Sequence, residues 1–124
     1  VFGKNEPISL SALRGKVVLL DFWIFHCGPC QDGVPKMNTI NEKYKKRDFQ
    51  LLSVNVGDTP KLIDLFIKTT GAEFTILQNG DEAAKRYGVI GFPTAVLIGK
   101  DGKVIYSGGF DYAKVDALIE QNLR

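Results

Sequence analysis

The sequence predicts an α/β fold in which helices flank a central mixed β-sheet. Apolar runs of strand length alternate with segments of helical periodicity along most of the chain, an order typical of parallel strands joined by helical crossovers. Two later strand-like runs are joined by Lys100-Asp101-Gly102-Lys103, where Asp-Gly predicts a tight type I′ hairpin. The hairpin adds antiparallel strands, so the sheet is expected to be mixed.

An N-terminal β extension is expected at the edge of this sheet. Phe2-Gly3 and Ile8-Ser9-Leu10 predict a short strand pair, followed by one helical turn that Gly15 closes. The run from Val17 to Trp23 predicts the first core strand, since it is apolar on both faces except at Asp21. A carboxyl group in a buried strand is either a satisfied polar residue or a functional one, and both interpretations stay open.

The segment from Pro29 to Lys46 predicts a helix with one buried stripe. Its apolar residues recur with three-to-four spacing, at Val34, Met37, Ile40 and Tyr44. Pro35 lies inside this helix and cannot donate a hydrogen bond to the carbonyl of Gln31, so we expect a kink just beyond the cysteines.

The rest of the chain continues to alternate strands and helices. The predicted elements are a strand over 49–56, a helix from Pro60 to about Thr70 that Thr59 caps and Gly71 ends, a short strand over 74–77, a short helix over 81–87, hairpin strands over 94–98 and 104–107, and a last helix capped by Asp111. Neither a repeat nor a linker interrupts this order, so residues 1–124 are expected to form one domain.

Composition and charge exclude several classes of protein. The 124 residues are 44% hydrophobic, enough for a buried core, and the formal net charge is only +2. The cluster of cations over 43–47 ends a predicted helix, where cations complement the helix dipole, so no nucleic-acid partner is expected. No run approaches the roughly 20 apolar residues of a membrane span. The sequence begins at Val1 rather than Met, which is consistent with a signal peptide or membrane anchor outside it.

Cys27 and Cys30 lie at the start of the helix that follows the first core strand. Two cysteines are too few for a disulfide-stapled scaffold or a four-ligand zinc site. At this spacing their Cα atoms are roughly 5 to 6 Å apart, which suits a disulfide that opens and closes, while Pro29 stiffens the loop between them. Unpaired N–H groups at the helix start favour the thiolate of Cys27, the expected exposed sulfur, with Cys30 as its resolving partner. An inert structural disulfide is the alternative.

Four groups of residues together resemble signature positions of the thioredoxin superfamily. They are Asp21-Phe22-Trp23, Cys27-Gly28-Pro29-Cys30, Pro35 and Gly91-Phe92-Pro93-Thr94. Two further features are similar to the TlpA/ResA-like family of bacterial thiol-disulfide oxidoreductases: the opening from Ile8 to Leu19, and the extra helix and strand between Val56 and Gly91. The resemblance covers nearly the whole chain and implies a thioredoxin-like fold with an N-terminal β extension and a helix-strand insertion.

The resemblance implies a redox enzyme with no cofactor other than its own disulfide. Cys27 would attack a protein substrate to form a mixed disulfide and Cys30 would resolve it, with the enzyme acting as a reductant. Asp21 would be a buried acid whose pKa is raised by desolvation and which exchanges a proton with Cys30. Pro93 would be a cis-proline facing the disulfide, beside backbone that pairs with an extended substrate segment; an ordinary trans proline is the alternative.

The substrate-binding surface implied by the resemblance surrounds these residues. It comprises Trp23, His26, Gly28, Pro29, Phe92 and Pro93. Two positions depart from the family pattern. His26 replaces a usual tryptophan, and either stabilises the Cys27 thiolate when protonated or is an exposed loop residue. Gly33 replaces the glutamate usual in cytochrome-maturation members, which weakens an assignment to apocytochrome reduction.

Two other classes of function fit the sequence less well. A metal-handling module would hold Cu(I) with Cys27, Cys30 and His26, although copper chaperones of related fold usually have a wider cysteine spacing and a distant histidine. A peroxidase of the peroxiredoxin type is less expected, because Ile24 stands where Thr-x-x-Cys requires threonine. The resemblance instead implies protein thiol or disulfide substrates and an upstream electron-donor protein. It also implies a location in the periplasm or another extracytoplasmic compartment, exported or membrane-anchored. The enzyme is expected to be a monomer.

Overall fold

The computed structural model describes residues 1–3 and 7–124. Within this part of the chain, a five-stranded sheet has the strand order β3-β2-β1-β4-β5. Its strands are β1 (Val17–Trp23), β2 (Phe49–Asn55), β3 (Thr75–Leu77), β4 (Thr94–Ile98) and β5 (Val104–Gly108). The pairs β1–β2 and β2–β3 are parallel, whereas β1–β4 and β4–β5 are antiparallel. The predicted mixed sheet is therefore confirmed.

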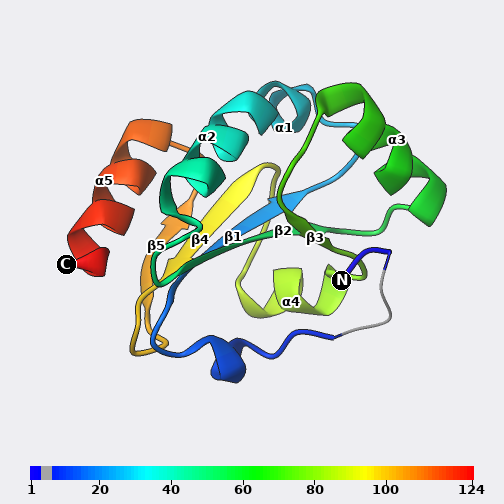
Figure 1. Cartoon of the computed structure of the whole chain (residues 1–124). Coiled ribbons are helices and arrows are strands. Elements are labelled where there is room, and N and C mark those ends of the chain that lie inside the picture. The colour runs from blue at the N-terminus through cyan, green and yellow to red at the C-terminus, as the bar shows by residue number, and fades with distance from the viewer. Residues whose placement is uncertain (4–6) are drawn as a thin grey trace.

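Helices cover both faces of the sheet (Figure 1). They are α1 (Gly28–Asp32), α2 (Val34–Tyr44), α3 (Pro60–Thr70), α4 (Asp81–Arg86) and α5 (Tyr112–Leu123). Alternate side chains of β1 point to opposite faces. Leu19 and Trp23 join an apolar cluster with residues of α2, α3 and α5, while Leu20 and Phe22 join a second cluster with Ala84 of α4. Asp21 has the parity of Leu19 and Trp23, so it faces the layer that contains the cysteines.

The kink expected beyond the cysteines is a break between α1 and α2 at Gly33. Pro35 has no N–H group for an intrahelical bond, and the Gly33 N–H donates to the carbonyl of Pro29 at 3.0 Å. The four residues of the predicted stripe are all buried: Val34, Met37, Ile40 and Tyr44. The break gives the cysteines a short helix of their own.

The helix-strand insertion is confirmed as α3 and β3, and local signals set the ends of α3. The Thr59 hydroxyl accepts a hydrogen bond from the Leu62 N–H, and Pro60 occupies the first turn. Gly71 ends the helix with a left-handed backbone, φ 73°. No helix in the described part of the chain has both the length and the apolar character needed to cross a membrane.

The predicted N-terminal β extension is wrong for the described residues. Leu10–Leu13 form a 3₁₀ helix. Phe2 lies in a turn, and its N–H donates to the carbonyl of Ile76 in β3 at 2.7 Å. Ile8 is 37% exposed and Pro7 has no N–H to offer a neighbouring strand. The segment therefore lacks both the buried face and the hydrogen-bond ladder that a strand requires.

The type I′ turn predicted for the β4–β5 hairpin is also wrong. A type I′ turn needs positive φ at both central residues. Here the Gly102 N–H donates to the Gly99 carbonyl at 3.0 Å, so Lys100 and Asp101 are the central residues of the turn. Neither of them has a positive φ; the residue that follows them, Gly102, does, at 84°. The Asp-Gly pair is thus used one position later than expected, and the strand register shifts between Leu97 and Ile98.

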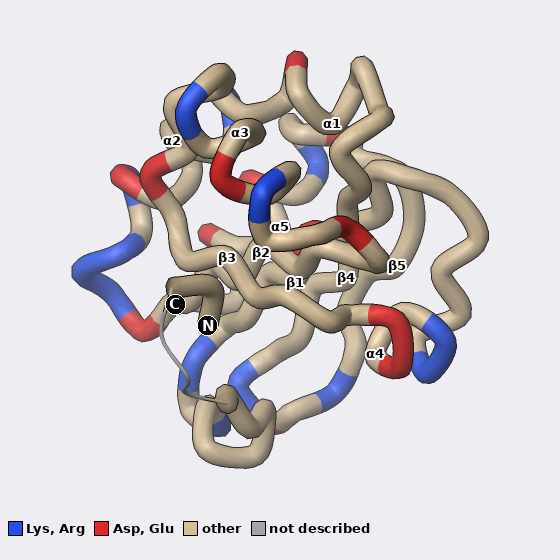
Figure 2. Tube along the Cα trace, turned by 90° about the vertical axis from the view of Figure 1, so that its right-hand side faces the viewer, with Lys and Arg blue, Asp and Glu red and all other residues tan. Residues whose placement is uncertain are grey.

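Charged residues are spread around the fold, with cations and anions interspersed (Figure 2). The basic cluster over 43–47 lies at the end of α2. Three of its cations form ion pairs: Lys43 with Asp116, Lys45 with Glu42 and Arg47 with Glu120. This local neutralisation agrees with a solvated helix end.

Candidate redox site

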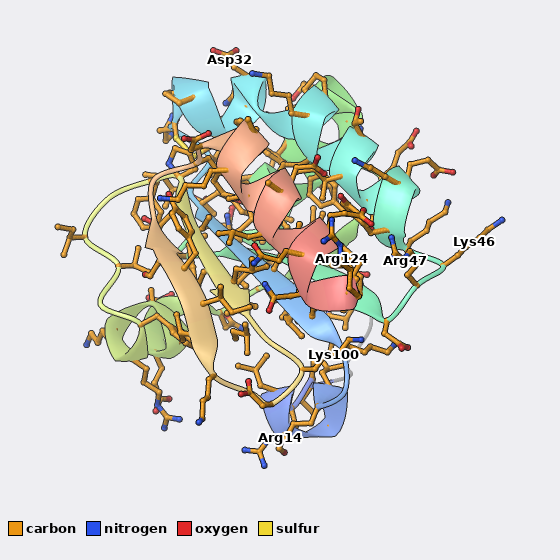
Figure 3. All side chains as sticks on the ribbon, turned by 90° about the vertical axis from the view of Figure 1, so that its left-hand side faces the viewer. Arg14, Asp32, Lys46, Arg47, Lys100 and Arg124 are labelled. Carbon is orange, nitrogen blue, oxygen red and sulfur yellow. A yellow bond between two sulfur atoms is a disulfide. The ribbon has the colours of Figure 1, made fainter. Side chains whose placement is uncertain are left out.

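The two cysteines lie where β1 ends and α1 begins. Asp32 of α1 marks this end of the molecule, and Arg14 and Lys100 lie at the opposite end (Figure 3). Cys27 and Cys30 form a disulfide with a Cα–Cα separation of 5.2 Å. The site is therefore at the carboxyl end of a central strand, where open α/β sheets place their functional groups.

The two sulfurs differ in their surroundings. Cys27 is half-buried and is the N-cap residue of α1, while Cys30 is only 8% exposed. The backbone N–H of Cys30 donates to Sγ of Cys27 at 3.1 Å. A donor aimed at a sulfur favours its thiolate, so this arrangement favours Cys27 as the attacking thiol once the pair is reduced. Gly28 and Pro29 are exposed and leave that side of the disulfide open.

Asp21 is a buried carboxyl on the same face of the sheet as the cysteines. It is 8% exposed, and its Oδ2 accepts a hydrogen bond from the hydroxyl of Ser53, its partner in the β1–β2 register, at 3.2 Å. Burial raises the pKa of Asp21 from 3.8 to about 7, and the Ser53 hydrogen bond opposes part of that increase. A carboxyl with this pKa can take up or release a proton near neutral pH.

Pro93 lies just before β4, the antiparallel neighbour of β1. The Phe92–Pro93 peptide bond is cis, the conformation that the family resemblance implies. In the β1–β4 register Thr94 lies opposite Phe22, so the proline loop adjoins the end of β1 that leads to Cys27. Phe92 is half-buried and packs against both apolar clusters.

Two of the predicted substrate contacts lie in very different places. Trp23 is 1% exposed and its ring stacks on Phe66 at a centroid distance of 3.8 Å. A side chain this deeply buried cannot touch a substrate, so Trp23 is a packing residue that supports the site. His26 is exposed, next to Cys27, and its ring meets the Phe25 ring edge-on at 5.1 Å.

The departure from the family pattern at Gly33 has a steric explanation. A Cβ at this position would overlap the hydroxyl oxygen of Tyr112 and lie 3.3 Å from the Pro29 carbonyl. Tyr112, at the start of α5, therefore fills the space that a side chain at position 33 would need. Burial, followed by the charge of Asp21, raises the pKa of Tyr112 to about 12. A neutral phenol thus stands beside the break between α1 and α2.

The groups that hold the loop before Cys27 belong to no motif recognised in the sequence. Oδ2 of Asp58 accepts hydrogen bonds from the Phe25 N–H at 2.6 Å and from the side-chain amide of Asn55 at 2.7 Å. The side-chain amide of Gln31 donates to the Phe25 carbonyl at 2.8 Å. The signal available in the sequence was Asn55, an amide at the end of a strand whose other residues, apart from Gln50 and Ser53, are apolar.

The described residues contain no group of three or more His, Cys, Asp or Glu side chains arranged to hold a metal ion. In the alternative copper site of Cys27, Cys30 and His26, the two sulfurs would have to be free thiolates, whereas here they are joined to each other. The chemistry that this arrangement offers is that of the disulfide itself.

The strand order, the Cys-x-x-Cys disulfide at the β1–α1 junction and the cis-proline before β4 define a thioredoxin-fold protein with a thiol-disulfide site. The chain belongs to the AhpC/TSA family, whose family model matches residues 3–107.

Individual relatives show which kinds of protein the chain resembles. The thiol-disulfide oxidoreductase ResA of Bacillus thuringiensis subsp. konkukian is 37% identical over 103 residues, which are 82% of this chain and 60% of the relative. The chain thus spans less than two thirds of that relative's length. A solved structure from Chlorobium tepidum, assigned as the thiol:disulfide interchange protein DsbE, is 38% identical with a TM-score of 0.78, covering 92% of this chain and 82% of that one.

A second solved structure supports the same fold. It is a thiol:disulfide interchange protein of the thioredoxin family from Chlorobium tepidum TLS, with a TM-score of 0.82, 22% identity and coverage of 96% of this chain and 88% of that chain. The predicted thioredoxin-like fold and the resemblance to ResA-like proteins are confirmed by these relatives.

Proposed function

We propose that this chain is a protein thiol-disulfide oxidoreductase that reduces disulfides in protein substrates. The observation that carries the proposal is the asymmetric Cys27–Cys30 pair. Cys27 is accessible and receives the Cys30 N–H, Cys30 is buried, and the two sulfurs already form a bond. The similarity to ResA, named a thiol-disulfide oxidoreductase, supports the same activity.

The proposed reaction starts from the reduced pair. The Cys27 thiolate attacks one sulfur of a substrate disulfide, a Cys27–substrate disulfide forms, and the other substrate sulfur leaves as a thiolate. Cys30 then loses its proton and attacks Sγ of Cys27, which releases the second substrate thiolate and restores the Cys27–Cys30 disulfide. Two electrons pass to the substrate, and an upstream protein must return them to the pair.

Asp21 is the proposed proton acceptor for Cys30. It faces the same layer as Cys30, and its pKa of about 7 allows it to accept a proton near neutral pH. A carboxylate on this side of the disulfide would take the proton as Cys30 becomes a nucleophile, and its protonated form would give it back when the pair is reduced.

The proposed substrate surface surrounds Cys27. It comprises His26, Gly28, Pro29, Phe92 and Pro93, each exposed or half-buried. An extended substrate segment would pair with backbone beside Pro93 and so bring its cysteine to Cys27. Because Ile24 replaces the threonine of Thr-x-x-Cys, we do not extend the proposal to peroxide.

The remaining features of the proposal concern the whole protein. We propose one domain over residues 1–124, acting as a monomer in an extracytoplasmic compartment, as implied by the similarity to TlpA/ResA-like proteins.

Trapping experiments test the roles of the two cysteines. Cys30→Ala should accumulate covalent complexes with protein substrates because the mixed disulfide at Cys27 is not resolved, whereas Cys27→Ala should not. Non-reducing electrophoresis followed by mass spectrometry measures the trapped species. Equal trapping by both variants would contradict the assigned order of attack. Metal analysis of reduced protein is the control for the copper alternative.

A further inference from the structure

The loop between β1 and α1 is held by groups from outside both elements. Asp58, in the connection between β2 and α3, accepts the Phe25 N–H at 2.6 Å. Its carboxylate is the acceptor of a charge-assisted hydrogen bond, a class roughly twice as strong as a neutral one. The contact joins residues 33 positions apart in the sequence, directly beside the redox pair.

A buried amide fixes Asp58 in turn. Asn55 is fully buried at the end of β2, opposite Trp23 in the parallel register. Its side-chain amide donates to Oδ2 of Asp58 at 2.7 Å, and its side-chain oxygen accepts the Asp58 N–H at 3.1 Å. The two reciprocal bonds leave Asp58 little freedom to turn away from Phe25.

Both peptide groups that flank Phe25 are therefore fixed. The Phe25 N–H belongs to the preceding peptide and is held by Asp58. The Phe25 carbonyl belongs to the following peptide and accepts from Gln31 at 2.8 Å and from the N–H of Cys27 itself at 2.9 Å. Peptide groups are planar, so holding both of them restricts the rotations that carry Cys27. Two residues of chain span at most about 7 Å, so the restraint acts close to the sulfur.

We propose that Asp58 is a positioning residue that holds Cys27 in bonding distance of Cys30 and thereby favours the disulfide over the dithiol. The inference deepens the proposed function and rests on it, since it concerns the redox equilibrium of the same pair. Closure of a disulfide depends on how well the two sulfurs are presented to each other. Releasing the loop before Cys27 lowers the effective concentration of one sulfur at the other.

The test measures the equilibrium constant of the Cys27–Cys30 pair with reduced and oxidised glutathione. Asp58→Ala removes both hydrogen bonds to Oδ2 and should lower the constant for disulfide formation about tenfold, which corresponds to a reduction potential about 30 mV higher. Asp58→Asn keeps an oxygen that can accept from Phe25 and Asn55, so it should stay within about threefold of wild type. Both variants remove the same charge, so their difference isolates the hydrogen bonds.

Asp64→Asn is the matched control. It removes a carboxylate from the nearby helix α3, where Asp64 pairs with Lys68 on the surface, and should leave the equilibrium unchanged. Loss of general stability would affect oxidised and reduced protein alike and would not move this equilibrium. Should Asp58→Ala fail to fold, Asp58→Ser takes its place, since its shorter side chain does not reach Phe25.

The outcomes separate this inference from the proposed function. A wild-type pair that exchanges with glutathione, together with an Asp58→Ala equilibrium equal to wild type, overturns the positioning role alone. So does an Asp58→Asn variant as impaired as Asp58→Ala. A wild-type disulfide that does not exchange at all overturns both.

Discussion

Asp21→Asn should make the protein more stable at alkaline pH while leaving its stability at acid pH nearly unchanged. Asn is close in shape to a protonated Asp and retains an acceptor for Ser53, which lies 3.2 Å from Oδ2 of Asp21. It cannot ionise, however. The substitution therefore removes the cost in folding free energy of burying a carboxylate away from water.

The size of the effect follows from the pKa of Asp21 in the two states. Burial raises it from 3.8 to about 7 in the folded protein. The folded state therefore binds the proton more tightly than the unfolded chain, so the stabilising effect is complete below the unfolded pKa and is lost as pH rises through the folded pKa. At about 1.4 kcal/mol per pKa unit, the folded wild-type protein has lost about 4 kcal/mol of stability at about pH 8 through ionisation of Asp21.

Urea unfolding of the oxidised protein at about pH 4 and about pH 8 measures this difference. Between about pH 4 and about pH 8, the free energy of unfolding of Asp21→Asn should rise by about 4 kcal/mol relative to that of wild type. Most of this rise should occur between the unfolded and folded pKa values of Asp21. Ser53→Ala is the companion variant. It removes a hydrogen bond that lowers the pKa of Asp21, so the pKa should rise and the loss of stability should continue to higher pH than in wild type. A stability difference between Asp21→Asn and wild type that is the same at both pH values would refute a buried, ionisable Asp21.

Two packing predictions can be checked by denaturant unfolding of purified variants. Gly33→Ala should cost about 1 to 3 kcal/mol because its Cβ overlaps the Tyr112 hydroxyl, and adding Tyr112→Phe should recover part of that loss. No recovery in the double variant would show that the hydroxyl is not the obstacle. Gly71→Ala should cost about 1 kcal/mol or more, because φ of 73° strains any residue with a Cβ. An unchanged midpoint would mean that the end of α3 adjusts without strain.

Local signals predicted the elements whose ends are set by neighbouring residues. Thr59, Pro60 and Gly71 supply both caps of α3 within one stretch of sequence, and the structure uses all three as expected. The Cys27–Cys30 pair was equally accessible to prediction, because its geometry depends on a three-residue spacing at a helix start. These features need no knowledge of the rest of the fold.

The unpredicted features depend on contacts between distant segments. Asp58 reaches Phe25 only because β1 and β2 are parallel with Trp23 opposite Asn55, a register that no local pattern specifies. The prediction of an N-terminal strand was wrong for a related reason. Alternating Ile8 and Leu10 satisfy a strand pattern, but a strand also needs a partner with free hydrogen-bonding groups, and η1 (Leu10–Leu13) forms instead.

The contact between Gly33 and Tyr112 couples two positions that lie at the starts of different helices. Since one volume serves both, bulk added at position 33 without loss of bulk at position 112 destabilises the fold. An acidic residue grafted at position 33 would therefore require a small residue at position 112. The polar group in this space would then stand at the start of α2 instead of on α5. In this fold, positions 33 and 112 compete for one space at the break between α1 and α2, against the carbonyl of Pro29.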